Sequence, residues 1–272
     1  MNKFQKKTLA ALVSSDVKWD CPLNHYTSFS IGGPADALVR VDKRDELVAL
    51  LRFLVEKKIQ WRVIGRGTNL LVRDHGYPGV IVILGEEFQR ISGAIGTDSE
   101  SVAMMAGGGC SLARLSLNCM EQGLAGLEFA SGIPGTVGGA VIMNAGAYGN
   151  ELSTIIKALT LITVDGELEI LRDDLDFGYR CWHVNKKFVG SSIVIEVKFS
   201  LKREDPSKIR EYCRTLQNKR RNIQPNKYAN AGSFFKNPIN ESAGRLIEAS
   251  GFKGMRVGGA MVSEKHANFL VN

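Results

Sequence analysis

The sequence predicts an α+β fold in which two lobes are followed by a smaller α+β domain. Apolar residues alternate as in strands in some segments and repeat at helical spacing in others, along the whole of the 272 residues. Two glycine-rich loops interrupt these segments, and Asp205-Pro206 marks a boundary before the last part of the chain. With 44% hydrophobic residues, a chain of this length can fill two or three cores.

Residues 1–22 are expected to form a small N-terminal helical segment. The apolar run at 8–13 is too short for a secretory core and is followed by Asp16 and Lys18. An amphipathic helix is therefore the better interpretation.

Residues 23–86 are expected to form the first lobe. Residues 27–41 are expected to be extended, and Asp42 is a candidate cap for the helix after them. The apolar residues of that helix fall on one face: Leu47, Leu50, Leu51, Leu54 and Val55. Strands at 61–64 and 80–84 complete the lobe.

Residues 87–203 are expected to form the second lobe. Strands are expected at 88–91 and 101–105, and a helix from Ser111 that stops at Gly123. Asp165-Gly166, between two strand-like runs, predicts a tight hairpin. Alternating apolar residues at 193–201 predict a half-buried strand that closes the lobe.

Residues 204–272 are expected to form the third unit. Pro206 suits the first position of a helix and Asp205 suits the cap before it. A second helix is expected at 244–250, ending at Gly251, and a final strand at 261–271.

The net charge of +7 favours anionic partners without choosing among them. The only dense basic run is Lys219-Arg220-Arg221 at a helix end, so no nucleic-acid partner is expected. No window approaches the ~18 apolar residues that span a bilayer, so no membrane partner is expected.

The cysteines and histidines predict reduced thiols and no metal site. The five cysteines are scattered and form no C-x-x-C pair, as is usual in a cytoplasmic protein. Cys181 and His183 lie two residues apart, but no second ligand pair accompanies them.

Two glycine loops are the strongest candidates for a binding site. In the stretch 124–149, Gly132, Gly135, Gly138 and Gly139 can turn backbone N–H groups toward an anion, although a plain surface loop is the alternative. The upstream loop, IGRGTNLL at 64–71, follows a short apolar strand. It is not a dinucleotide fingerprint, because G-x-G-x-x-G requires glycine where Leu70 stands. Two such loops predict an anion-binding site that differs from the usual dinucleotide-binding motif.

Several motifs, taken in order, resemble the UDP-N-acetylenolpyruvoylglucosamine reductase family. They are IGRGTNLL at 64–71, GIPGTVGG at 132–139, NAGAYG at 144–149, FGYR at 177–180, GSFFKNP at 232–238 and SEKHANF at 263–269. The resemblance extends from about Leu23 to the last residue. The order of the motifs makes it specific, where any one alone would be weak.

The resemblance implies a two-lobed FAD-binding domain of the vanillyl-alcohol-oxidase type. Its lobes would be 23–86 and 87–203, with a smaller α+β substrate-binding domain at 204–272. The cofactor-binding positions that it implies are Gly65, Arg66, Gly67, Thr68, Asn69, Leu70, Gly132, Ile133, Pro134, Gly135, Val137, Gly138, Gly139, Asn144 and Gly146.

The resemblance also implies an oxidoreductase activity. NADPH would reduce FAD, and the enolpyruvyl group of UDP-N-acetylglucosamine enolpyruvate would be reduced to give UDP-N-acetylmuramate. This reaction belongs to peptidoglycan precursor synthesis, and so to cell wall biogenesis, cell shape and cell division. The expected partners are the UDP-sugar and NADPH, and the protein is expected to be a cytoplasmic monomer.

Hydride addition to the vinyl carbon requires a cation near the carboxylate and a proton donor near the adjacent carbon. By motif match, the resemblance implies Arg180 as the cation and Ser233 as the proton donor. From the residues alone, an interlobe ion pair for Arg180 and a turn-capping hydroxyl for Ser233 are the alternatives.

Five further positions are implied for the substrate: Tyr148, Arg221, Lys236, Asn237 and His266. Arg221 and Lys236 would serve the diphosphate. Arg221 also suits a helix C-terminus, and His266 can equally be a core histidine.

Two departures from the family pattern leave other functions open. Trp182 stands where the family usually has serine, and the family's third catalytic residue is a glutamate in a segment beyond the HANF motif. We therefore expect the substrate-binding domain to be incomplete, with Glu241, Glu248 and Glu264 as possible substitutes. The alternatives are an FAD-dependent oxidase or dehydrogenase of the same flavin fold, or a catalytically impaired, truncated homologue that binds FAD.

Overall fold

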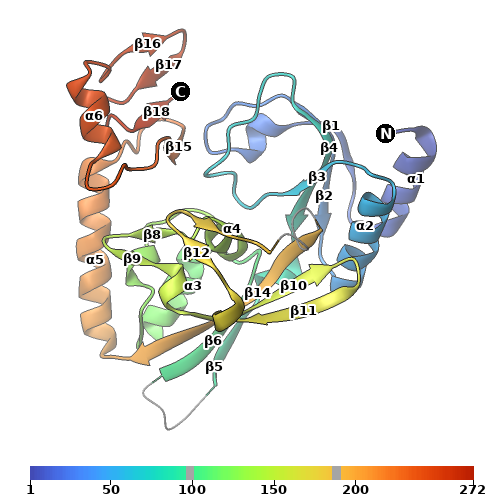
Figure 1. The fold of residues 1–272 in the computed structure, drawn as a ribbon, viewed down its shortest axis with the longest axis horizontal. Helices are drawn as coiled ribbons and strands as arrows, with labels where there is room; N and C mark the ends of the chain where they lie inside the picture. Colours follow the sequence, from blue (N-terminus) through green and yellow to red (C-terminus); the bar gives the residue numbers. More distant parts are fainter. Residues whose placement is uncertain (96–100, 186–190) are drawn as a thin grey trace.

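The computed structural model describes residues 1–95, 101–185 and 191–272. Its helices and strands form two sheets that meet near the middle of the molecule, and a third, smaller sheet carried at the end of a long helix (Figure 1). The third sheet and the first lobe stand on the same side of the second lobe.

The first lobe is a four-stranded sheet with two helices packed on it. Its strands are β1 (Lys18–Pro22), β2 (Pro34–Val41), β3 (Trp61–Val63) and β4 (Tyr77–Leu84), in the order β1-β2-β4-β3. Strands β2, β4 and β3 are parallel, and β1 is antiparallel to β2. The helices are α1 (Lys3–Leu12) and α2 (Arg44–Glu56).

The N-terminal segment differs from the helical one expected for residues 1–22. Residues 18–22 form β1, in which Cys21 lies opposite Ala35 and is buried. Leu9 of α1 is fully buried in the core of the first lobe. The segment is thus part of the first lobe, because its apolar side chains are buried in the same core as those of β2, β4 and α2.

The expected cap of α2 is wrong. The helix begins one residue later than expected, with Lys43 as its N-cap and no side-chain cap. The carboxylate of Asp42 instead accepts hydrogen bonds from the backbone N–H of Glu86 and from Nε of Arg40. Glu86 lies 44 residues further along the chain, so a local pattern cannot reveal this partner.

The second lobe is an antiparallel sheet in the order β11-β10-β14-β6-β5. Its strands are β5 (Ile91–Ile95), β6 (Ser101–Gly107), β10 (Ile156–Thr163), β11 (Gly166–Leu171) and β14 (Ser192–Arg203), with β7 (Leu124–Ala125) paired to the end of β14. Helices α3 (Leu112–Glu121) and α4 (Val137–Ile142) pack on one face.

The sequence patterns of the second lobe are largely confirmed. Thr163 pairs with Gly166, which confirms the hairpin turn at Asp165-Gly166. The helix expected from Ser111 is α3, which begins at Leu112 with Ser111 as its N-cap. The strand expected at 88–91 is wrong, because 86–89 form a 3-10 turn that buries Phe88, and β5 starts at Ile91.

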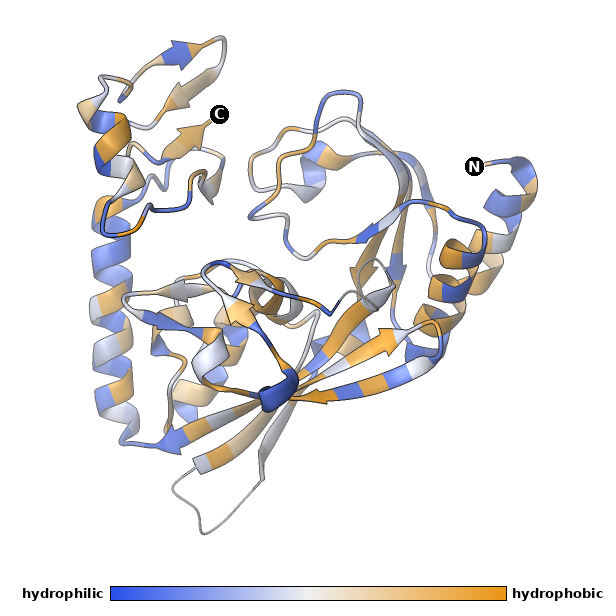
Figure 2. Cartoon of the chain, viewed as in Figure 1, coloured by the Kyte–Doolittle hydropathy of each residue, from blue (hydrophilic) through white to orange (hydrophobic). Residues whose placement is uncertain are grey.

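The two lobes share apolar residues through β10 and β14. Leu161 and Phe199 belong to the core of the second lobe, whereas Ile162, Ile193 and Ile195 pack into the core of the first. Figure 2 shows the apolar character of these strands where the lobes meet. Burial of each such side chain stabilises the fold by roughly 1.5–3 kcal/mol, so these residues hold the two lobes together.

The C-terminal part stands on the long helix α5 (Pro206–Ile223), which starts as expected with Asp205 capping the N–H of Ser207. It contains α6 (Ala243–Ala249) and the strands β15 (Asn230–Ser233), β16 (Arg256–Val257), β17 (Ala260–Val262) and β18 (Phe269–Val271), in the order β15-β18-β17-β16. The single strand expected at 261–271 is wrong. The hydroxyl of Ser263 accepts from the N–H groups of Lys265 and His266 and turns the chain between β17 and β18.

The C-terminal part is attached to the first lobe. The hydroxyl of Ser28 donates to the carbonyl oxygen of Asn230 at 2.7 Å, and Asn272 donates to the carbonyl oxygen of Phe29. The rings of Phe29 and Phe234 lie edge to face. The backbone N–H of Ser28 also donates to the carbonyl oxygen of Gly67 in the first glycine loop. These contacts therefore hold the C-terminal sheet beside that loop.

Two short hairpins lie on the second lobe. The first pairs β8 (Gly146–Ala147) with β9 (Asn150–Glu151), and the second pairs β12 (Phe177–Gly178) with β13 (Cys181–Trp182). Among the described residues, no helix combines the length and the apolar character needed to cross a membrane.

Candidate active site

The two glycine loops, 64–71 in the first lobe and 132–139 in the second, lie against each other. The hydroxyl of Thr68 donates to the carbonyl oxygen of Pro134 at 3.1 Å. A Cβ at Gly65 would come within 2.3 Å of Oγ1 of Thr136. Glycine at position 65 therefore allows the two loops to approach this closely.

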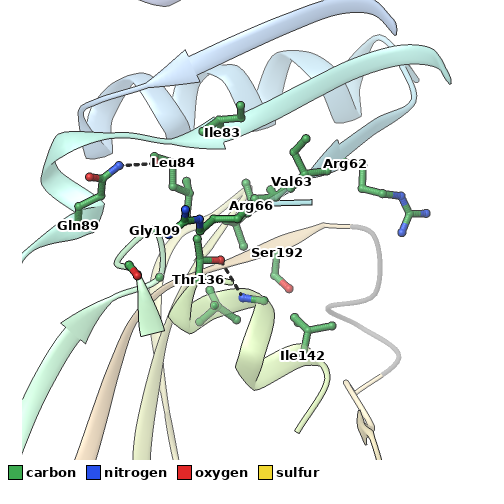
Figure 3. A pocket seen from close by; sticks show the side chains of 18 of the residues that line it. Arg62, Val63, Arg66, Ile83, Leu84, Gln89, Gly109, Thr136, Ile142 and Ser192 are labelled. Carbon is green, nitrogen blue, oxygen red and sulfur yellow. Dashed lines mark hydrogen bonds between the residues drawn. The ribbon is translucent and has the colours of Figure 1, made fainter. Parts of the chain in front are cut away.

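A cavity of about 740 Å³ opens between the lobes at this contact. Figure 3 shows Val63, Arg66 and Ile83 of the first lobe on one side, and Thr136, Ile142 and Ser192 of the second lobe on the other. Its volume lies within the range of cofactor and ligand sites. The complete lining is Trp61, Arg62, Val63, Ile64, Gly65, Arg66, Ile83, Leu84, Gln89, Gly108, Gly109, Ser111, Arg114, Thr136, Gly138, Gly139, Ile142, Trp182, Val184, Ser192, Ile193 and Val194.

The first glycine loop presents a row of unused donors. None of the backbone N–H groups at 65–69 donates a hydrogen bond to another group in the described part of the chain. Gly67 is buried and has φ of +61°, and a Cβ there would come within 2.0 Å of the carbonyl oxygen of Tyr26. Consecutive free N–H groups in such a turn form an anion-binding concavity.

The cavity wall is electropositive. Arg62, Arg66 and Arg114 line it, and no aspartate or glutamate among the described residues does. The guanidinium of Arg114 also donates to the carbonyl oxygen of Gln89, which orients it. Guanidinium groups and free N–H groups together suit a diphosphate.

The second glycine loop is held by a third glycine segment, at 107–109. Gly138 N–H donates to the carbonyl oxygen of Gly108 at 2.8 Å, and Val137 N–H donates to that of Cys110 at 2.9 Å. The site residues predicted from the sequence do not include Gly108, Gly109 or Thr136, although the sequence contains the run of three glycines at 107–109.

Of the cofactor positions implied by the resemblance, Gly65, Arg66, Gly138 and Gly139 line the cavity. The others support the loops or lie beside them. Val137 is buried in the core, Ile133 and Leu70 pack against apolar clusters, Gly135 lies beside Thr68, and Gly146 packs closely on Asn150. Asn69 is exposed.

Asn144 is fully buried and serves the hairpin that carries Arg180. Its Oδ1 accepts from the N–H of Ser153 at 3.0 Å, and its Nδ2 donates to the carbonyl oxygen of Gly178 at 3.1 Å. Its backbone has φ of +37°, which asparagine tolerates better than most residues.

Asn144→Ala is expected to destabilise the protein by about 1–3 kcal/mol, because the N–H of Ser153 and the carbonyl of Gly178 lose their buried partner. Urea unfolding measures this loss. The matched control is Asn118→Ala, whose carboxamide bonds to Gln122 on the exposed surface of α3 and whose loss should cost well under 1 kcal/mol. Equal stability of the two variants would contradict the role of Asn144.

Arg180 lies in the turn of the β12–β13 hairpin with φ of +58° and its guanidinium over the ring of Tyr179. Nζ of Lys236 donates to the carbonyl oxygen of Tyr179 at 3.1 Å. Ser233, at the end of β15, is exposed. The structure thus brings the FGYR and GSFFKNP motifs together through Lys236, although no hydrogen bond joins Arg180 to Ser233 among the described residues.

The residues implied for the substrate have structural contacts of their own. The hydroxyl of Tyr148 donates to the carbonyl oxygen of Leu216 in α5 at 2.9 Å. Oδ1 of Asn237 accepts from the N–H of Ala243 at the start of α6. Arg221 is exposed near the end of α5.

Arg220 is a cation for which the sequence predicted no role in substrate binding, whereas its neighbour Arg221 was expected to bind the diphosphate. It is half-buried and packs over Gly132, where a Cβ would come within 2.9 Å of its Cδ. Burial lowers the pKa of its guanidinium from the usual value. Its guanidinium makes no hydrogen bond or ion pair within the described residues. No sequence signal distinguishes Arg220 from Arg221, because the bend of the glycine loop decides which one is covered.

His266 is half-buried between Gly244 and the ring of Phe269. Burial lowers the pKa of its imidazole from the usual 6.5, and Lys253 adds to the effect. Between the folded-state and the unfolded-state pKa of His266, the unfolded chain binds more protons than the folded one. The stability that the neutral, buried imidazole contributes is therefore present above the unfolded-state pKa and is lost as the pH falls below it.

When the pH is lowered from about 7.5 to about 5.5, the free energy of unfolding is therefore expected to fall less for His266→Gln than for the unsubstituted protein. Urea unfolding at the two pH values measures the difference. His75→Gln, at an exposed histidine, is the matched control and should retain the original dependence. A pH dependence unchanged by the His266 substitution would contradict this account.

The three candidate carboxylates differ in their surroundings. Hydrogen bonds from Arg245 lower the pKa of Glu241 to about 2, and Glu248 pairs with Lys253 at 2.7 Å. Glu264 lies near Gly254 and forms no ion pair within the described residues. Glu241 is thus poorly suited to carry a proton at neutral pH.

Comparisons with known proteins identify relatives over nearly the whole chain. Residues 35–172 match the family model of an FAD binding domain, and residues 224–272 match that of the C-terminal domain of UDP-N-acetylenolpyruvoylglucosamine reductase. The chain is 43% identical over 270 residues to the UDP-N-acetylenolpyruvoylglucosamine reductase of Syntrophus aciditrophicus, which covers 99% of this chain and 85% of the relative. It is 40% identical over 252 residues to that of Bacillus subtilis, covering 92% and 80%.

Solved structures give the same result. The UDP-N-acetylenolpyruvylglucosamine reductase of Thermus caldophilus superposes with a TM-score of 0.79 at 36% identity, over 94% of this chain and 87% of the other. Cholesterol oxidase from Brevibacterium sterolicum matches with a TM-score of 0.50 at 13% identity, over 69% and 38%. The latter shows the fold alone. Together these matches confirm the expected α+β fold class with an FAD-binding domain of the oxidase type.

Proposed function

Because the chain belongs to the UDP-N-acetylenolpyruvoylglucosamine reductase family, we propose that it reduces UDP-N-acetylglucosamine enolpyruvate to UDP-N-acetylmuramate with FAD and NADPH. This reaction supplies a peptidoglycan precursor. The observation that carries the proposal is the electropositive cavity between the two glycine loops, with the Arg180 turn and the C-terminal sheet beside it.

The residues present fit FAD. The free N–H groups of 65–69 and the guanidinium groups of Arg62 and Arg66 suit its diphosphate. Gly108, Gly138 and Gly139 leave a wall without side chains, along which a flat ring can approach the backbone. The chemistry that FAD supplies when bound is hydride transfer from NADPH to the enolpyruvyl group.

In this proposal Arg180 stabilises the negative charge that develops on the substrate, and Ser233 supplies the proton that completes the reduction. Arg180 holds the substrate carboxylate in a bidentate pair and stabilises the negative charge that hydride addition places next to it. Ser233 donates the proton of its hydroxyl to the carbon adjacent to that carboxylate. Arg180 stands in the hairpin turn with φ of +58°, and its guanidinium lies over the ring of Tyr179.

Cations of the C-terminal part receive the UDP-sugar. Lys236 lies at the Arg180 turn, and Arg220 and Arg221 end the helix that Tyr148 contacts. The unpaired, half-buried guanidinium of Arg220 suits one phosphate of the substrate, with Arg221 at the second. Asn237 and His266 frame the sugar.

Anaerobic spectroscopy tests the proposal in two steps. The purified protein, loaded with FAD, is expected to lose its flavin absorbance on addition of NADPH. The enolpyruvyl UDP-sugar should then restore the absorbance without oxygen, because the substrate takes the hydride. Mass spectrometry of the product should show the saturated lactyl ether.

A matched arm distinguishes the oxidase alternative. Air added to the reduced protein in place of the UDP-sugar should restore the absorbance more slowly than the UDP-sugar does. Rapid reoxidation by air with no response to the UDP-sugar would contradict the reductase.

We further propose that the protein is a cytoplasmic monomer with no nucleic-acid or membrane partner. In this proposal the basic run at the end of α5 binds a small anionic substrate. The reaction would contribute to cell wall biogenesis, and so to cell shape and division.

A further inference from the structure

Three side chains on the β12–β13 hairpin form a hydrogen-bonded chain that the reductase reaction does not use. Sγ of Cys181 lies 3.1 Å from Nε2 of His183, and Nδ1 of the same imidazole lies 2.9 Å from Oδ2 of Asp176. The three groups are arranged in line and do not converge on one point. Within the described residues, no group of three such side chains could hold a metal ion.

This order of groups activates a thiol. A carboxylate only accepts hydrogen bonds, so Asp176 selects the tautomer of His183 that carries its proton on Nδ1. Nε2 is then the acceptor for the proton of Cys181. A thiol paired with an oriented imidazole is the usual arrangement of a nucleophilic cysteine.

Gly178 leaves room for this arrangement. A Cβ there would come within 2.9 Å of Cε1 of His183 and 3.1 Å of Sγ of Cys181. The sulfur and the ring thus lie close over the backbone of the hairpin. The hairpin itself is tied to the lobe by Asn144, through the carbonyl oxygen of Gly178.

Cys181 is also the one accessible thiol of the chain. The other four cysteines, all within described segments, are buried, and burial raises the pKa of Cys110, Cys213 and Cys119, the last to about 12. Cys181 is half-buried, and His183 and Asp176 are exposed. A soft electrophile in solution therefore meets Cys181 first.

The thiol is not part of the cavity wall. Trp182 and Val184 line the cavity, whereas neither Cys181 nor His183 belongs to its lining. Cys181 and His183 nevertheless lie only one and three residues from Arg180 in the sequence. A reagent can reach the sulfur without entering the site.

We propose that Cys181 is a redox modification site, in which His183 and Asp176 activate the thiol toward hydroperoxides beside the catalytic turn. His183 takes the thiol proton, and the sulfur attacks the terminal oxygen of the hydroperoxide. The O–O bond breaks, an S–O bond forms, and the leaving oxygen takes the proton from His183 to depart as water or an alcohol. Sulfur loses two electrons and the peroxide gains them, which gives Cys181 sulfenic acid.

Oxidation at this position is expected to lower the reductase activity, and this step rests on the proposed function. The oxidised side chain follows Arg180 directly in a turn whose backbone is already held at φ of +58°. A polar oxygen on the sulfur competes for the imidazole and shifts the turn. Dithiothreitol should reverse the effect, because a sulfenic acid is reduced by thiols.

Alkylation of the folded protein, followed by peptide mass spectrometry, tests the assignment. Iodoacetamide at neutral pH is expected to label Cys181 at least about tenfold faster than it labels glutathione, and to leave Cys110, Cys119 and Cys213 unmodified. His183→Asn should slow the labelling by at least about tenfold, and added imidazole should restore part of the rate. Asp176→Asn should slow it, and Asp176→Glu should recover it. The matched control is His75→Asn, at an exposed histidine of the first lobe, which should change nothing.

A peroxide arm completes the test. Treatment with hydrogen peroxide followed by dimedone should label Cys181 and lower turnover in the original protein, whereas Cys181→Ser should keep its turnover. Labelling of Cys181 no faster than of glutathione, or a rate unaffected by His183→Asn, would overturn the assignment. Labelled protein with full turnover would overturn the coupling to Arg180. A protein without turnover before treatment would contradict the proposed function instead, and the labelling would still decide this inference.

Discussion

Replacing Ser233 with alanine is expected to leave reduction of the bound flavin by NADPH intact and to slow reoxidation by the enolpyruvyl UDP-sugar about 10²- to 10⁴-fold. The loss corresponds to about 3–5 kcal/mol, because the intermediate must then take its proton from water. The two half-reactions separate the effect, since only the second requires a proton donor. Anaerobic stopped-flow absorbance measures both rates.

The control is Ser250→Ala, in the same part of the chain. The hydroxyl of Ser250 donates to the carbonyl oxygen of Leu246 on the exposed side of α6, so neither half-reaction should change. Equal losses in the two half-reactions of the Ser233 variant would remove the serine from its role as proton donor and point to a general effect on folding.

Replacing Gly67 with valine is expected to abolish retention of FAD during purification. Its φ of +61° strains any β-branched residue, and a Cβ would come within 2.0 Å of the carbonyl oxygen of Tyr26. Strain of this kind costs on the order of 1–3 kcal/mol before the clash is counted, so the loop must move and its row of N–H groups is lost. We expect FAD affinity to fall at least about 100-fold.

Flavin fluorescence during titration of the FAD-free protein measures this affinity. Gly93→Val serves as the matched control, because a Cβ at Gly93 meets nothing within 4 Å and its φ is ordinary. FAD binding by the Gly67 variant at the affinity of the control would show that the first glycine loop does not hold the cofactor.

The sequence was most informative where structure is decided locally. The helical stripe of α2, the hairpin at Asp165-Gly166 and the start of α5 at Pro206 depend on neighbouring residues, and all three are present. The expected cap by Asp42 was wrong, because its carboxylate accepts hydrogen bonds from the nearby Arg40 and from the backbone N–H of the distant Glu86. Competition of this kind between local and distant partners is not visible in a linear pattern.

The candidate site was predicted in outline through its motifs. Glycine spacing and the family resemblance identified the two loops, but not which residues line the cavity between them. Gly108, Thr136 and Trp182 enter the wall only because the lobes fold against each other. The buried role of Asn144 and the covering of Gly132 by Arg220 depend in the same way on tertiary packing.

A crystal structure of the protein with FAD would show where the cofactor binds. We expect the FAD diphosphate against the backbone of 65–69 and the isoalloxazine ring in the cavity between the lobes, facing Arg180 and Ser233. Density for the flavin outside this cavity, or a ring distant from both side chains, would show that the glycine loops and the catalytic turn do not form one active site.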